Sequence, residues 1–426
     1  MAEINEQQIG IDGQFLVDEY RNYRRWGSIL ILGGFLLLIG GLSVSALFQD
    51  DTVPVAETGK MGVHLLLDDG RNNWDTSLWE SHISYAAQIS SDGGIAVQVI
   101  RSDDLAPERW QVFMDLSTEY NLSPVLRLST TFDFDNGWWT APQRGADGRY
   151  QQWGQNYADF INALDWGDAP KRVILLNETN NGHEWGGVPN PEDYANFVVD
   201  VAAVLRQEVP DIVILNGAFD LNLPDTNGQF FPGSNVVLIN ANSYIDRMEA
   251  AQPGIFDTFD IWNSHPYPLD IRRHPNEQFY RFDYMNGAAE TAIAPPDGIF
   301  NRGINGYEWE LWKLQQLGYS ADIPIMITET GWRHSSAIDA SSADAAPDYP
   351  SPEQVAEYFQ LALSGGEEVT FTPWLEDERV IAIAPFALNG VPNEWSHTNL
   401  LQITANGEVI GTYPHFETLA AIASGE

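Results

Sequence analysis

The sequence predicts a (β/α)8 barrel, a TIM barrel of the α/β class, preceded by a single N-terminal transmembrane helix. Eight short apolar runs alternate with helical patterns, which is typical of βα units around a parallel sheet. Connections leaving several of these runs are long, whereas connections into them are mostly short. An uncharged apolar segment near the N-terminus completes the three observations that predict this architecture.

The apolar segment covers residues 29–48, and its length matches a bilayer core of about 30 Å. Arginines precede it and aspartates follow it, so the N-terminus is expected in the cytoplasm and the remainder outside the cell membrane. A cleaved signal peptide is the alternative. We expect four parts along the chain: a cytoplasmic segment (1–26), a transmembrane helix (27–48), a linker (49–60) and the barrel (61–426).

The expected strands are the eight apolar runs, which lie at residues 61–67, 95–100, 124–128, 173–177, 212–215, 259–264, 323–328 and 380–386. Between the fourth and fifth runs, Asn190 and Pro191 open a helical pattern as cap and first residue. Ser351 and Gln354 open another helix with a capping box. An open doubly wound sheet is the alternative, but no glycine-rich phosphate loop follows the first strand.

The composition limits the classes of partner. The chain of 426 residues has 60 acidic against 21 basic residues and a net charge of −39. Nucleic acid is not an expected partner, because its binding requires Lys and Arg to neutralise phosphates. The absence of cysteine excludes disulfides, thiolate nucleophiles and cysteine metal sites.

Two glutamates stand where a barrel builds its active site. Glu178 directly follows the fourth expected strand and Glu329 directly follows the seventh, so both lie at the mouth formed by the strands' C-terminal ends. A pair of carboxylates suits glycosidic cleavage, in which one protonates the leaving oxygen and the other attacks the anomeric carbon or activates water. For a lone glutamate, a structural role at a strand end would be the better interpretation.

The motifs LLNE (175–178), WNSHPYP (262–268) and ITETGW (327–332), with a Trp after strand eight, resemble the superfamily of retaining glycoside hydrolases with a (β/α)8 barrel. The resemblance covers residues 61–426 and implies that Glu178 is the acid/base and Glu329 the nucleophile. It also implies further substrate or supporting contacts by a set of residues matched to its motifs, namely Asn177, His265, Tyr267, Trp332 and Trp395.

Some positions leave alternatives open. The superfamily commonly has an arginine near the end of strand two that supports the nucleophile, which Arg101 resembles, and Arg127 in strand three is its rival. His265 is either a site residue or a satisfied buried histidine. Tryptophans in the loops, at 138, 139, 185, 332 and 395, either stack on sugars or pack the loops.

The pair His183 and Glu184 does not continue into the second histidine that a zinc protease helix needs, so both are expected to be loop residues that contact substrate. No metal and no cofactor are expected. The resulting hypothesis is a membrane-anchored, extracytoplasmic glycosidase that acts on a carbohydrate with retention of configuration. The alternatives are a transglycosylase, or an inactive barrel that binds carbohydrate or serves a membrane-protein partner as a structural subunit.

Overall fold

The computed structural model describes residues 59–268, 272–282, 284–285, 292–336, 349–367 and 369–425. The predicted transmembrane segment at 27–48 and the cytoplasmic segment before it lie outside the described residues. Within the described ranges, no helix combines the length and apolarity needed to cross a bilayer.

Eight parallel strands form the centre of the fold and occupy the eight predicted places. They are β1 (Val63–Leu65), β2 (Ile95–Arg101), β3 (Ser123–Ser129), β6 (Lys171–Leu175), β7 (Ile212–Leu215), β8 (Trp262–Ser264), β9 (Ile325–Ile327) and β10 (Val380–Ile383). Hydrogen bonds join β1-β2-β3-β6-β7 and β8-β9-β10. Parallel bridges at Leu215–Ile261 and Met61–Ile383 connect these two sheets on both sides, so the ring closes. The predicted barrel is confirmed.

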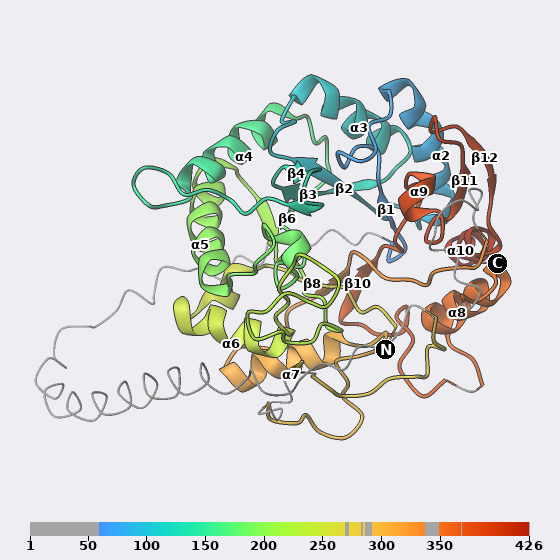
Figure 1. Ribbon diagram of the computed structural model, residues 1–426. Helices are drawn as coiled ribbons and strands as arrows, with labels where there is room; N and C mark the ends of the chain where they lie inside the picture. The colour runs from blue at the N-terminus through green and yellow to red at the C-terminus, as the bar shows by residue number, and fades with distance from the viewer. Residues whose placement is uncertain are drawn as a thin grey trace, which may run out of the picture. The chain divides into compact units, whose positions relative to one another are not determined.

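Helices surround the strands in chain order, as Figure 1 shows. They are α2 (Trp79–Ile89), α3 (Pro107–Glu119), α4 (Gln151–Ala163), α5 (Pro191–Glu208), α6 (Ala241–Ala251), α7 (Tyr307–Leu317), α8 (Pro352–Ser364) and α10 (Pro414–Ser424). The caps follow the prediction: the Asn190 side chain accepts from the Asp193 N–H, and Ser351 forms a capping box with Gln354.

Side chains pack in two layers that follow from strand alternation. One buried cluster fills the barrel and includes Val97, Val125 and Met326, whereas a larger cluster lies between the strands and the helices. On β3, Val125 points inward and Leu126 and Leu128 point to the helices. Arg127 therefore has the inward parity, close to the C-terminal end of the strand.

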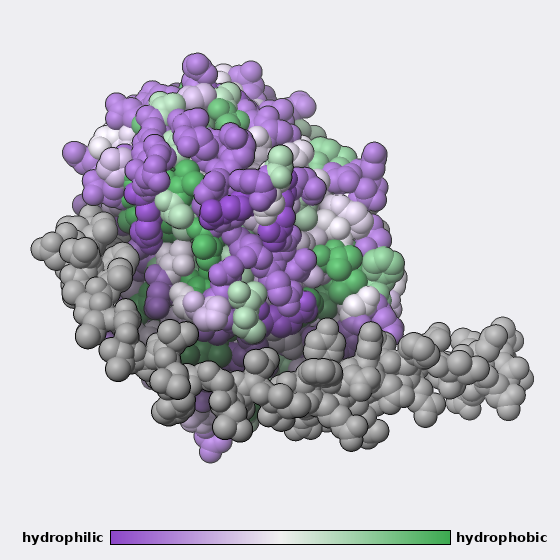
Figure 2. Space-filling view, turned by 90° about the vertical axis from the view of Figure 1, so that its left-hand side faces the viewer, coloured by the Kyte–Doolittle hydropathy of each residue, from purple (hydrophilic) through white to green (hydrophobic). Residues whose placement is uncertain are grey.

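The long loops lie at the mouth, as predicted. The loop after β3 forms a hairpin of β4 (Phe132–Asp133) and β5 (Trp138–Trp139), and the loop after β6 contains the short helix η2 (Gly182–Glu184). The segment after β10 contains α9 (Pro392–Trp395) and a hairpin of β11 (Leu401–Ile403) and β12 (Val409–Thr412). The face in Figure 2 is mostly hydrophilic, with apolar residues in separate small areas, which agrees with the acidic composition.

One buried carboxyl outside the mouth makes stability depend on pH. Glu310 on α7 is fully buried against Ser264, and burial raises its pKa from 4.5 to about 8. Between these values the folded chain keeps a proton that the unfolded chain has lost, so stability falls as pH rises.

In wild type, the free energy of unfolding should fall by up to about 1.4 kcal/mol per pH unit because of Glu310. We expect this fall to be absent from Glu310→Gln. Urea unfolding of both proteins from pH 5.5 to 8 measures this difference. Equal pH slopes for wild type and variant would show that Glu310 does not titrate in this range.

Candidate active site

The two predicted glutamates meet at the barrel mouth. Glu178 lies three residues after β6 and Glu329 two residues after β9. One carboxylate oxygen of each, together with a ring nitrogen of His265, lie within 4.8 Å of one another. Their side chains are 15% and 8% exposed, so both carboxylates are accessible at the floor of the mouth.

The backbone that presents Glu178 is strained and firmly held. Leu176 and Glu178 have φ of 66° and 33°, a left-handed region that costs a non-glycine residue about 1 kcal/mol or more. The Glu178 N–H donates to the Gly217 carbonyl at 2.6 Å. Gly217 has no room for a side chain, because a Cβ would lie 2.7 Å from the Leu175 oxygen and 2.9 Å from the Tyr194 hydroxyl. Neighbouring strand ends therefore fix the position of Glu178.

Cationic and donor groups surround Glu329. An Arg127 Nη1 donates to its Oε1 at 2.5 Å, and the Tyr267 hydroxyl donates to its Oε2 at 3.2 Å. Both interactions stabilise the negative charge of Glu329, as a nucleophile requires. His64 on β1 lies 3.7 Å away, and burial followed by the charge of Arg127 holds its pKa well below the usual range. His64 is therefore a neutral neighbour.

A chain of hydrogen bonds assigns the proton on His265. The Asn263 amide donates to the Asn216 carbonyl at 3.2 Å, and its oxygen accepts from the Thr328 hydroxyl at 2.6 Å. Because that hydroxyl has one hydrogen, His265 Nε2 must donate to it, at 3.1 Å. Burial lowers the pKa of His265 to about 4, so the ring is neutral and Nδ1 carries no proton.

This bare nitrogen faces Glu178. His265 Nδ1 lies 2.9 Å from Glu178 Oε1, a distance that suits a protonated carboxyl as the donor. Burial, and secondarily the negative charge of Asp220, raise the pKa of Glu178 to about 8. Glu178 is thus kept protonated beside Glu329, whose negative charge Arg127 and Tyr267 stabilise, and this is the division that an acid and a nucleophile need.

The two carboxylates line a cleft with two parts. An inner cavity of about 170 Å³ holds Glu178 and Glu329, and an outer cavity of about 380 Å³ shares Glu178 with it. Tyr267, Phe386 and Trp395 also line both parts. The cleft therefore continues on either side of Glu178.

Besides Arg127 Nε, two buried polar atoms of residues that line the inner cavity have no hydrogen-bond partner among the described residues. They are Asn177 Oδ1, whose residue lines the inner cavity, and Trp395 Nε1. An unpaired buried acceptor or donor costs about 1 to 3 kcal/mol, which a ligand hydroxyl can recover. Both residues are among those expected to contact substrate.

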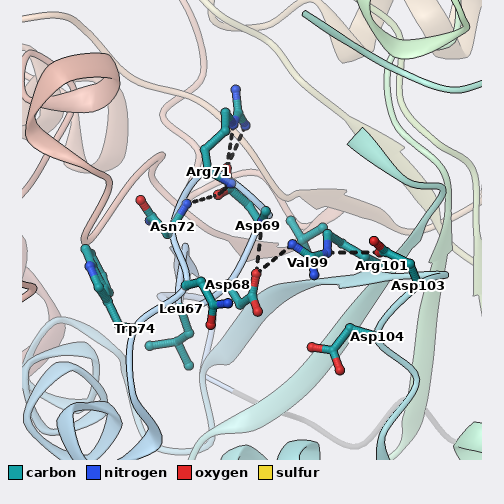
Figure 3. A network of polar contacts seen from close by, with 12 residues as sticks. Leu67, Asp68, Asp69, Arg71, Asn72, Trp74, Val99, Arg101, Asp103 and Asp104 are labelled. Carbon is teal, nitrogen blue, oxygen red and sulfur yellow. Dashed lines mark hydrogen bonds and ion pairs between the residues drawn. The ribbon is translucent and has the colours of Figure 1, made fainter. Parts of the chain in front are cut away.

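The structure separates the two candidate arginines. Arg127, whose parity points into the barrel, contacts Glu329, whereas Arg101 bonds to Asp68 at 3.0 Å and Asp103 at 3.1 Å. Figure 3 shows Arg101 turned towards these aspartates. The hypothesis that Arg101 supports the nucleophile is therefore wrong. Arg101 ends β2, where it forms ion pairs with carboxylates of the loops after β1 and β2.

Of the other predicted residues, some line the cleft and some pack against the rest of the protein. Trp332 touches the outer cavity, but its indole N–H donates to the Arg273 carbonyl at 2.8 Å and its ring packs on Phe359. His183 is exposed and bonds the Gly137 carbonyl at 3.2 Å, whereas Glu184 lines the inner cavity. Both lie in the single turn η2, which agrees with the expected loop.

His64 and Asp220 were not predicted. His64 interrupts the apolar run of the first strand, a signal that could have been noticed, whereas Asp220 has no sequence signal that connects it to Glu178. The triad of Glu178, His265 and Glu329 has spacing that a cation could use, but Arg127 already occupies one Glu329 oxygen with positive charge. This arrangement suits proton transfer better than metal binding.

Asp220 provides a test of the acid. We expect Asp220→Asn to move the alkaline limb of the kcat/KM profile to lower pH by up to about one unit, because a negative charge beside Glu178 is removed. Glu178 stays buried in this variant, so the pKa that the alkaline limb reports should stay above the ordinary value for a glutamate. A pH profile on an aryl glycoside measures the shift, and Asp159→Asn on the exposed face of α4 is the control. An unchanged limb would exclude Asp220 from this role.

Comparison with known proteins supports the fold. No family model and no curated protein matches the chain. A fungal β-1,4-galactanase structure is 13% identical over 84% of this chain and 99% of its own, with a TM-score of 0.50. A β-glucosidase from Exiguobacterium marinum is 13% identical over 86% of this chain and 98% of its own, with a TM-score of 0.50. A glucosidase from Croceicoccus marinus is 9% identical over 86% of this chain and 68% of its own, with a TM-score of 0.52. The chain thus has the (β/α)8 barrel fold found in these glycoside hydrolases.

Proposed function

We propose that the protein hydrolyses O-glycosidic bonds of a carbohydrate with retention of configuration. The observation that carries the proposal is the pair of Glu178 and Glu329, whose carboxylate oxygens approach within 4.8 Å at an open barrel mouth. Retaining enzymes place their carboxyl groups about 5 to 5.5 Å apart, whereas inverting enzymes need about 6.5 to 9.5 Å to admit water.

The chemistry follows from the two environments. Glu329, held by Arg127 and Tyr267, attacks the anomeric carbon while Glu178 gives its proton to the leaving oxygen. The bond from anomeric carbon to leaving oxygen breaks and an ester to Glu329 forms. Glu178, now ionised, takes a proton from water as the water oxygen attacks that carbon, which releases the sugar and restores both carboxyls.

The geometry favours turnover over a barrel that only binds sugar. A barrel without catalysis has no need to keep a protonated Glu178 beside a second carboxylate in one cleft, and here Glu178 lines both of the cleft's parts. A carboxyl that lies in a cleft and has a pKa shifted by its surroundings is typical of catalytic sites. Transfer to a sugar acceptor in place of water would use the same residues.

The location belongs to the same proposal. The uncharged run at residues 29–48, with arginines before it and aspartates after it, supports a membrane anchor with the barrel on the extracytoplasmic side. Alkaline extraction of membranes should leave the chain in the pellet, and protease added to intact cells should cleave the barrel from its anchor. Release into the supernatant would exclude the anchor and leave the catalytic proposal unaffected.

The stereochemistry of the product tests the mechanism. Proton NMR of the anomeric signal, recorded during hydrolysis of a panel of 4-nitrophenyl glycosides by the full-length protein, should show first a product with the substrate's configuration. Appearance of the opposite anomer first would establish inversion and contradict the role of Glu329 as nucleophile. A sugar transferred to an added alcohol would show that acceptors other than water enter the cleft.

A further inference from the structure

The hairpin of β4 and β5 carries an exposed aromatic side chain close to the cleft. Phe134 at its turn is 66% exposed, although a ring of this size is costly to leave in water. It belongs to a line of cation–π and edge-to-face ring contacts that begins inside the cleft. We call this line, made of Trp395, Arg71, Phe132 and Phe134, the hairpin track.

The hairpin track is continuous from the catalytic pair to the surface. Trp395 lines both parts of the cleft, and the Arg71 guanidinium lies 5.0 Å from its ring centroid. The same guanidinium lies 5.1 Å from the Phe132 ring, and Phe132 lies 5.1 Å from Phe134. The first two steps are cation–π contacts, and the Phe132 and Phe134 rings meet edge to face, at an interplanar angle of 77°.

The track is held in place before any ligand binds. Asp69 accepts from Arg71 Nε at 2.9 Å and so fixes the guanidinium between the two rings. The hairpin itself is tied to its neighbours, because the Gly186 N–H donates to the Trp139 carbonyl at 2.7 Å and the Asn235 amide donates to the Asn136 carbonyl at 3.0 Å. A preorganised surface binds with a smaller entropy cost.

We propose that the hairpin track is a distal subsite for an extended, uncharged glycan, so that the protein cleaves internal bonds of a chain. This inference rests on the proposed function and names its substrate class. The cleft continues on either side of Glu178, as cleavage within a chain requires, and the track lengthens it beyond the inner cavity.

The charge around the track selects among occupants. Asp133 and Asp135 flank Phe134, and the whole chain carries a net charge of −39, so anionic glycans and anionic lipid surfaces are repelled. The apolar faces of neutral sugar rings suit flat aromatic side chains. A neutral polysaccharide that also enters the cleft satisfies both conditions.

The test compares substrate lengths in the full-length protein. The probes are 4-nitrophenyl glycosides of one sugar unit and of six β-1,4-linked units, made with glucose, mannose or galactose. For wild type, kcat/KM should rise by about tenfold or more from one unit to six. Phe134→Ala should lose about 3- to 10-fold on six units, mainly through KM, and nothing on one unit. Ile410→Ala, which trims another exposed apolar side chain, on β12 and 58% exposed, should match wild type.

Equal kcat/KM for one and six units, or a Phe134→Ala variant that matches Ile410→Ala on six units, would overturn the distal subsite and leave the glycosidase proposal standing. Absence of turnover on every probe would contradict the proposed function itself. Binding keeps the subsite testable without turnover, because affinity electrophoresis of Glu329→Gln through a neutral polysaccharide should show retardation that the added Phe134→Ala change weakens. Equal retardation with and without that change would also overturn the subsite.

Discussion

Glu329→Gln is expected to lower kcat/KM on aryl glycosides by about 10⁴-fold or more, which corresponds to about 5.5 kcal/mol of lost transition-state stabilisation. The amide has the shape of the carboxylate but cannot form the ester to the anomeric carbon. The negative charge that Arg127 and Tyr267 stabilise is lost at the same time. Initial rates on an aryl glycoside that wild type hydrolyses measure the effect.

Glu119→Gln, on the exposed end of α3, is the matched control and should retain wild-type rates. Circular dichroism should show that all three proteins are folded. A Glu329→Gln variant within about tenfold of wild type would place the nucleophile elsewhere, because loss of a covalent nucleophile costs far more than that.

Glu178→Gln is expected to have an effect that depends on the leaving group. A poor leaving group needs the proton from Glu178, so its release should slow by about 10³-fold, within the usual range for acid catalysis. A 2,4-dinitrophenyl leaving group needs little protonation, so the first step should be nearly unaffected. Hydrolysis of the ester should then become limiting, because water has lost its base, and KM should fall.

Azide should restore turnover of the 2,4-dinitrophenyl glycoside by Glu178→Gln, because it attacks the ester without a base. The product should be a glycosyl azide with the configuration of the substrate, identified by NMR. Equal losses on both leaving groups, without azide rescue, would show that Glu178 does not serve as the acid/base.

Local patterns predicted the frame of this site well. The apolar runs, the caps at Asn190 and Ser351 and the long loops at one end were visible because each depends on neighbours in sequence. The positions of Glu178 and Glu329 then followed, since the end of a parallel strand determines which end of the barrel a residue occupies.

The partners of these residues could not be predicted in the same way. Arg127 and Arg101 both have inward parity at strand ends, and Arg101 turns away because it pairs with Asp68, in the loop after β1, and with the neighbouring Asp103. Asp220 affects Glu178 across two neighbouring strands, and the proton on His265 depends on a chain of bonds through Thr328. Such contacts depend on the closed ring rather than on local sequence.

Covalent trapping identifies the nucleophile directly. The full-length protein is incubated with a panel of 2-deoxy-2-fluoroglycosyl fluorides, which form the glycosyl ester but slow its hydrolysis, and is then digested for peptide mass spectrometry. We expect one added fluoroglycosyl group on Glu329, which should be absent from Glu329→Gln and should still form in Glu178→Gln. A label on another carboxylate that persists in Glu329→Gln would contradict the role of Glu329 as the nucleophile.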